Sequence, residues 1–389
     1  MRPSTIIVPV IAAVLLAVGG GFTLWWATRE PEPLSLELTT PKLAMEQFVE
    51  QGAKPIFFTL AAVPYLKEHW KQWERAFGPY PSTPEELALQ FETTAQSPQA
   101  WRVLDRKWHF DLVLLAGDPA AFSPLLEHLR SSPDWTLVQL DPSSIVFKRS
   151  PARRWTTADL VPLLAVFQAR SAEEQNRARV LIAHRLMFLG EMPAAKGLLN
   201  EVLTADPKSV AALTELASMH GMLGQWPESI KIAARALALD RNYRPAQFVQ
   251  ANAFYALGRF PDALEVTRRL FVVAPSDGPS LLMHAKTTHA AHSFGEEIAV
   301  LQQLIGLMQS HGQPVGLWQI YLGQAYASTG AGNLSEDQFK AALLDESLSA
   351  EDRAFAQKGL ERLGVKTMLN NVPSFPKEAS LLDAPAYRP

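Results

Sequence analysis

SVAALTELASMHGMLGQWPESIKIAARALALD spans residues 209–240, and its pattern recurs along the chain with a period of 34 residues. Three columns of residues keep this spacing, namely Gly190, Gly224 and Gly258; Ala183, Ala217 and Ala251; and Ala195, Ser229 and Ala263. A fixed period of this length indicates supersecondary units that stack on one another.

Each period contains two amphipathic segments. Leu213, Leu216 and Ala217 have helical spacing. Gly224 is suited to end this helix, because glycine tolerates the left-handed conformation, and Pro227 suits the first turn of the next helix. Two helices whose axes lie about 8–10 Å apart need small side chains where their backbones approach, which accounts for the small columns. A single pair cannot bury its apolar face, so neighbouring pairs must stack.

The pattern resembles the tetratricopeptide repeat, whose 34-residue unit carries W-x2-L-G-x2-Y, then A-x3-F, then a terminal proline. The partial matches are Phe254 near the end of a first helix; Ala195 with Leu199 and Ala263 with Thr267; Pro207 and Pro275; and Trp318, Leu322-Gly323 and Tyr326, with one extra residue after the tryptophan. The resemblance implies an all-α solenoid over residues 176–364. Residues 281–307 look like a degenerate unit with a small insertion.

In this family the first helix of each pair lines a concave binding face. Carried over in register, the resemblance implies protein-binding positions at His184 and Met187; at Thr214, Ser218 and Gly221; and at Phe248, Asn252 and Tyr255. Residues 248, 252 and 255 share one helix face, so the aromatic rings and the amide are expected to contact a peptide. The alternative is that these are ordinary solvated or inter-repeat contacts. Lysine and arginine are missing from these positions, so the family's basic clamp for a C-terminal carboxylate is not expected.

The segment before the repeats predicts a small α/β layer domain over residues 34–150. Buried strands are expected at 55–60 and 111–116, a helix at 121–130, and a hairpin at 135–140 and 144–148. The part from Asp111 to Arg149 is similar to the soluble C-terminal module of multi-pass membrane glycosyltransferases of the mannosyltransferase type. That resemblance implies a shared module and not an enzyme, because catalysis in those proteins is implied to lie in their membrane portion.

Residues 6–26 form an apolar run without charge, long enough to span a bilayer. It is either an uncleaved anchor or a cleaved signal peptide. The run is longer than a usual signal core and no clean A-x-A site follows, which favours the anchor. Arg2 favours a cytoplasmic N-terminus. We therefore expect a single-pass protein of a bacterial inner membrane with an extracytoplasmic body; the alternative is secretion after cleavage. Residues 1–33 would be anchor and linker, 151–175 linking helices, and 365–389 a disordered tail.

The composition excludes several classes of function. The net charge of −3 gives no reason to expect nucleic acid, and the absence of cysteine excludes disulfides, thiolate catalysis and cysteine-ligated zinc. Three polar clusters are interpreted as surface residues. The first is His284, His289 and His292; the second is Lys107, His109 and Asp111; the third is Glu85-Glu86. We therefore predict no cofactor, metal or catalytic site, although an unrecognised transferase or hydrolase site in residues 34–150 stays open.

The fold class expected overall is α+β, with one transmembrane helix, a small α/β domain and a helical solenoid. The function expected is a membrane-anchored, non-catalytic scaffold or adaptor that binds a protein or peptide in the groove of the repeats. The alternative is an accessory subunit of cell-envelope glycan or lipid-linked sugar assembly that acts through the α/β domain. The sequence leaves the partner and the oligomeric state open.

Overall fold

The computed structural model describes residues 56–59, 62, 91, 94, 95, 97–149, 171–273, 277–310 and 312–364. The predicted membrane span, the predicted linking segment up to residue 170 and the C-terminal tail lie outside these ranges. The chain forms two compact units, which meet in the sequence between Ala291 and His292. Within the described ranges, no helix combines the length and the apolar character needed to cross a membrane.

Four strands of the first unit form a mixed sheet in the order β1-β2-β4-β3. They are β1 (Ile56–Phe58), β2 (Leu112–Ala116), β3 (Trp135–Leu140) and β4 (Ser144–Arg149). β1 is parallel to β2, and β4 is antiparallel to both of its neighbours. In the turn between β3 and β4, the buried Asp141 carboxylate accepts hydrogen bonds from the backbone N–H of Ser143 at 2.9 Å and of Ser144 at 2.6 Å. The predicted strands and hairpin are confirmed.

Helices pack against this sheet around an aromatic core. They are α8 (Pro98–Trp108), the short 3-10 helix η3 (Pro119–Phe122) and α9 (Ser123–Ser131). The Trp101 ring lies 4.9 Å from Phe57 in β1 and 5.6 Å from Phe110, measured between ring centroids. We call residues 56–149 the sheet domain. Its buried apolar cluster continues without a break into the first repeats, as far as Ala246.

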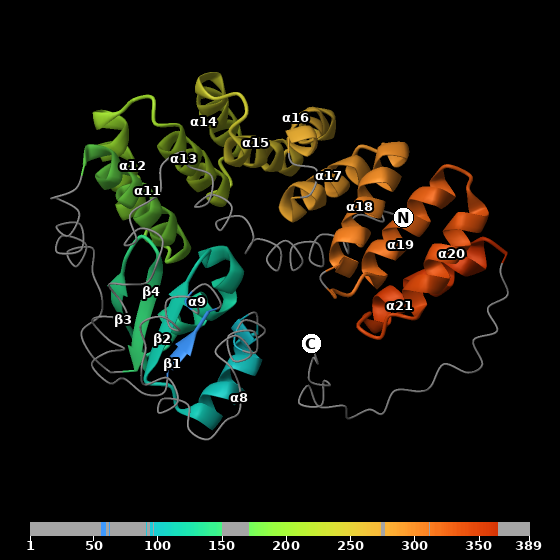
Figure 1. Cartoon of the computed structure of the whole chain (residues 1–389), viewed down its shortest axis with the longest axis horizontal. Helices are drawn as coiled ribbons and strands as arrows, with labels where there is room; N and C mark the ends of the chain where they lie inside the picture. Colours follow the sequence, from blue (N-terminus) through green and yellow to red (C-terminus); the bar gives the residue numbers. More distant parts are fainter. Residues whose placement is uncertain are drawn as a thin grey trace. The chain divides into compact units, whose positions relative to one another are not determined.

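Within the described ranges, the same unit continues with the helices of the repeats (Figure 1). They are α11 (Ala172–Phe188), α12 (Met192–Ala205), α13 (Val210–Met222), α14 (Trp226–Leu239), α15 (Arg244–Ala256), α16 (Phe260–Val273) and α17 (Gly278–Ala290). The glycines of the repeat column have φ of +76°, +71° and +72°, which is the left-handed conformation expected of them. This is a TPR-like array of helix pairs, and it confirms the predicted period.

The two helices of each pair can approach closely because small residues lie at the contact between them. The small columns are fully buried, with Ala183, Ala217 and Ala251 on the first helices and Ala195, Ser229 and Ala263 on the second. One period after Ala263, the column holds the buried carboxylate of Glu297 in place of a small residue. The boundary between the two compact units falls in this fourth pair: α17 packs on α16, and the helix that carries Glu297 packs on the helix after it.

The second unit contains α18 (Phe294–Ser310), α19 (Gly316–Ser328), α20 (Gly332–Leu343) and α21 (Ala350–Arg362). The small insertion expected here is present, because α18 has 17 residues where α12, α14 and α16 have 14 each. Two glycines make room for the Phe339 ring: an added Cβ would lie 3.1 Å from it at Gly323 and 2.7 Å at Gly359.

A larger side chain in the small column should destabilise the array. We expect Ala217→Leu to lower the free energy of unfolding by about 1–3 kcal/mol, because the extra methylene groups have no space between α13 and α14. Urea unfolding followed by circular dichroism would measure this. The matched control is Ala234→Leu on the exposed side of α14, for which we expect a change within about 0.5 kcal/mol. Equal midpoints for the two variants would contradict the packing argument.

Candidate functional site

Four residues occupy the same register position on successive first helices, each 34 residues from the next. They are His184 in α11, Ser218 in α13, Asn252 in α15 and Lys286 in α17. One turn further along each helix stand Met187, Gly221, Tyr255 and His289. Each of these helices contacts the next first helix, so the positions follow one another across neighbouring helices. We call these eight residues the first-helix face.

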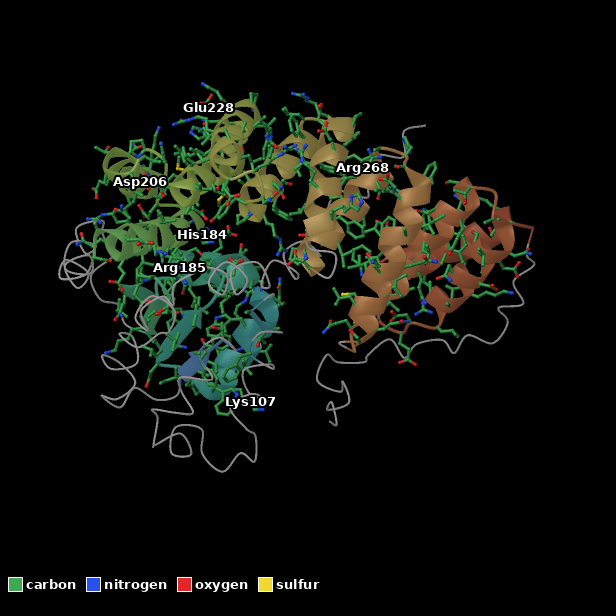
Figure 2. The ribbon with its side chains drawn as sticks, turned by 45° about the horizontal axis from the view of Figure 1, so that its top comes forward. Lys107, His184, Arg185, Asp206, Glu228 and Arg268 are labelled. Carbon is green, nitrogen blue, oxygen red and sulfur yellow. The ribbon has the colours of Figure 1, made fainter. Side chains whose placement is uncertain are left out.

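The first position of this face is occupied by the chain's own sheet domain. His184 Nδ1 lies 2.9 Å from Glu215 Oε2 of α13, and its Nε2 lies 3.6 Å from Asp118 Oδ1 of the sheet domain. The His184 side chain is only 15% exposed. Figure 2 shows His184 and Arg185 on α11 where this helix approaches the sheet domain. His184, which the sequence placed in a partner-binding groove, therefore lies in an internal junction.

The junction keeps the imidazole of His184 charged. Burial by itself would lower the pKa of His184, but the charges of Glu215 and Asp118 and the hydrogen bond to Glu215 outweigh it and raise the pKa to about 10. A protonated ring between two carboxylates is an ion pair and not a general base at neutral pH. This cluster therefore holds two parts of the chain together.

Two arginines complete the junction. Arg185 Nη2 donates to the carbonyl of Gly117 at 3.2 Å, and Arg130 Nη1 donates to the carbonyl of Leu189 at 2.5 Å. Burial lowers the pKa of Arg185 to about 10, although the nearby carboxylates of Asp141 and Asp118 oppose the shift. The sequence analysis did not predict this junction.

Three further positions from the sequence analysis present almost no surface to a partner. Met187 is buried in the apolar cluster that the first repeat shares with the sheet domain. Thr214 is buried as well, and its hydroxyl donates to the carbonyl of Val210 at 2.8 Å. Gly221 is buried beside Trp226, whose ring would lie 3.3 Å from an added Cβ. Their assignment to an open groove is corrected here.

The accessible part of the first-helix face lies in the second to fourth repeats. Ser218, Asn252 and Tyr255 are each partly exposed. Phe248 and Tyr255 are both partly buried and pack against the cluster of Ala251, Val266 and Met283. The predicted trio of residues 248, 252 and 255 is thus brought together on one helix, α15.

Lys286 adds a charge that the sequence analysis missed. Its ammonium lies 4.1 Å from the centroid of the Tyr255 ring, which is cation–π geometry. Burial lowers the pKa of Lys286 and raises the pKa of the Tyr255 hydroxyl. No carboxylate in the described ranges pairs with this ammonium. Lys286 lies one period after Asn252. The sequence analysis interpreted residues 281–307 as a degenerate unit and did not carry the register into them, so it expected no basic residue on this face.

The structure describes two of the other polar clusters. His284 was expected at the surface, but it is buried, with its Nδ1 3.0 Å from Thr267 Oγ1 and its ring stacked on Phe271. Lys107, His109 and Asp111 are exposed, as Figure 2 shows for Lys107. Within the described residues, no group of three or more histidine and acidic side chains is arranged to hold a metal ion. Glu85-Glu86 lies outside these residues.

Comparison with known proteins gives only distant likenesses. No protein-family model and no curated protein matches the chain. A TPR protein of Thermus thermophilus has 21% identity over 48% of this chain and 99% of its own, with a TM-score of 0.34. YrrB, described as a TPR protein with an unusual peptide-binding site, has 12% identity over 47% and 91%, with a TM-score of 0.41. MamA of Desulfovibrio magneticus has 15% identity over 43% and 93%, with a TM-score of 0.38.

The charged junction predicts a pH-dependent effect of His184→Gln. Because the folded-state pKa lies above the ordinary value of 6.5, the contribution of His184 to stability is complete below pH 6.5 and is lost as the pH rises toward about 10. Removing the charge takes the His184 cation away from the Glu215 and Asp118 carboxylates, so we expect a loss of about 3–5 kcal/mol at pH 6. The difference from wild type should shrink steadily toward pH 10.

Thermal unfolding at a series of pH values would measure this difference, and the comparison with wild type cancels the titration of groups that both proteins share. His220→Gln is the control, since this ring hydrogen-bonds to the neutral side chain of Gln225 in the turn after α13. A His184→Gln effect that stays constant from pH 6 to pH 10 would rule out the ion pair as its cause.

Proposed function

We propose that this protein is a non-catalytic scaffold that binds a protein or peptide on the first-helix face of its second to fourth repeats. The observation that carries the proposal is Lys286, a partly buried cation held over Tyr255 with no acidic partner in the described ranges. A cation removed from bulk water without a counter-charge is costly unless a ligand supplies one. The expected ligand therefore brings an acidic group to Lys286.

The spacing of the face suits an extended peptide. Neighbouring helices pack about 8–10 Å apart, and an extended chain rises about 3.3 Å per residue. Side chains at the same register position on adjacent helices therefore meet peptide residues about three apart. Ser218 and Asn252 offer neutral hydrogen-bonding groups for the peptide backbone, while Tyr255 and Lys286 offer an aromatic surface and a charge.

Replacing the charge should weaken partner binding. We expect Lys286→Gln to reduce affinity about tenfold at low salt, the equivalent of one charge-assisted hydrogen bond, and the loss should be smaller at high salt. The partner would first be captured by crosslinking and affinity purification of the full-length, membrane-embedded protein, identified by mass spectrometry, and then titrated against purified variants. Lys196→Gln makes the same change on the exposed surface of α12 and serves as control.

A second pair of variants tests the face itself. Asn252→Ala with Tyr255→Ala should remove the captured partner, whereas Asn200→Ala on the exposed surface of α12 should keep it. A partner kept by the double variant would contradict binding at this face. It would favour the alternative function, an accessory role in cell-envelope glycan or lipid-linked sugar assembly through the sheet domain.

One observation favours that alternative. A cleft of about 600 Å³ lies between the sheet domain and the turn after α11. Its walls combine the Trp135, Leu137 and Phe147 side chains with the polar groups of Arg130, Ser131, Ser132, Thr136 and Glu191. Aromatic surface beside polar groups is the composition of many small-ligand sites, and a sugar presents both kinds of surface.

We further propose that residues 6–26 anchor the protein in a bacterial inner membrane with its body outside the cytoplasm; the support is the length and apolar character of the run. We expect the protein to stay with the membrane after an alkaline carbonate wash, and a variant without residues 2–33 to be released. N-terminal sequencing of the mature protein tests the alternative, because a chain that begins after residue 26 would mean secretion with a cleaved signal peptide.

A further inference from the structure

The turn between the paired helices is built identically in the first three repeats. In the second repeat, the N–H groups of Leu223, Gly224 and Gln225 donate to the carbonyls of Met219, Gly221 and His220 at 3.1, 2.9 and 2.8 Å. The equivalent bonds recur around Gly190 and Gly258. This arrangement satisfies carbonyls of the last helical turn but leaves the carbonyl of the leucine before the glycine without a donor from its own helix.

In the first repeat, the sheet domain uses that leucine carbonyl. Arg130 Nη1 donates to the Leu189 carbonyl at 2.5 Å, and the guanidinium lies so close to Gly190 that an added Cβ would be 2.0 Å from Nη1. Leu189 is only 2% exposed. The first turn therefore binds Arg130 through three features: the Leu189 carbonyl, which has no donor from its own helix; Gly190, which allows close approach; and the buried Leu189 side chain.

In the second repeat, the same turn is open. Leu223 is 48% exposed and Met222 is 44% exposed, whereas Trp226 beside them is partly buried. An added Cβ at Gly224 would meet nothing within 4 Å, and no described residue donates a hydrogen bond to the Leu223 carbonyl. The turn carries no charged side chain between Met222 and Trp226.

The third turn is less suited to a cation. Leu257 is 40% exposed, but Arg259 follows Gly258, where it pairs with Asp262 at 2.8 Å and lies over the Phe254 ring. A second guanidinium would be repelled there. Of these two exposed turns, the second therefore matches the Arg130-binding turn of the first repeat better.

We propose that the second turn, Met222–Trp226, binds an arginine-bearing segment of a partner protein. The guanidinium donates to the Leu223 carbonyl across Gly224, at the end of α13 where the helix dipole favours a cation. The apolar surface of Met222, Leu223 and Trp226 covers the arginine stem and an apolar neighbour. This turn repeats the backbone geometry of the turn that Arg130 already contacts in the first repeat, and its residues are not part of the first-helix face.

The occupant is not expected to be the sheet domain of a second copy. That domain also needs His184 and Arg185, and one period later these positions hold Ser218 and Met219. Ser218 carries no charge to pair with Asp118, and Met219 cannot donate to Gly117. A second sheet domain would thus lose the polar contacts that fix it on the first repeat.

A defined probe can test this proposal on the full-length protein. The probe is a fluorescein-labelled peptide of residues 123–135, SPLLEHLRSSPDW, which reproduces the segment that docks on the first turn. Fluorescence anisotropy would give its dissociation constant. We expect saturable binding that weakens about tenfold when the peptide carries Arg130→Gln, and about tenfold when the protein carries Leu223→Ser.

Leu239→Ser is the matched control, because Leu239 at the end of α14 is 45% exposed and lies outside the turn; it should leave the affinity unchanged. No saturable binding, or equal binding of the Arg130→Gln peptide, would overturn the proposal. Equal effects of Leu223→Ser and Leu239→Ser would do the same. Self-association of the wild-type protein that Leu223→Ser abolishes would identify a second copy as the occupant and would also overturn it.

Discussion

The close approach of two helices at small side chains is the constraint on which this molecule depends. Buried alanines and a serine recur every 34 residues where α11 to α16 pair, and this spacing fixes which side of each first helix can face outward. It also fixes the glycine turns and hence the leucine carbonyls beside them. Glu297 stands in place of the small residue one period after Ala263, and the chain divides into two compact units just before the helix that carries it.

The junction between the sheet domain and the first repeat is built from charges that would be costly alone. His184 lies between two carboxylates, and Arg185 and Arg130 reach backbone carbonyls on opposite sides of the interface. Breaking such buried charged contacts strongly destabilises a fold. They therefore specify which repeat the sheet domain packs on. The repeats share their turns, but the residue pair His184 and Arg185 does not recur: Ser218 and Met219 stand one period later.

Periodicity predicted the helix pairs and turns, and alternation predicted the strands, because both depend on local spacing. Periodicity also placed Ser218, Asn252 and Tyr255 on an accessible face. It could not show that Met187 and His184 are covered, since that depends on a separate part of the chain folding back onto α11. Lys286 was within reach of the sequence, since its helix keeps the 34-residue register and only the following helix α18 is lengthened. Partner, membrane anchoring and location remain proposals.

A stack of identical units has a difficulty at its ends, where the last apolar face has no neighbour. Here the sheet domain covers the beginning of the stack, and the polar helix α21 follows its last pair. In the first unit, successive repeat helices from α11 to α17 pack on their neighbours along the chain. A tandem duplication of a 34-residue segment such as residues 210–243 would therefore lengthen the array without altering the junction at His184 or the final helix. In this architecture the number of repeats can change while the fold stays intact. The length of the binding surface is therefore free to vary in evolution.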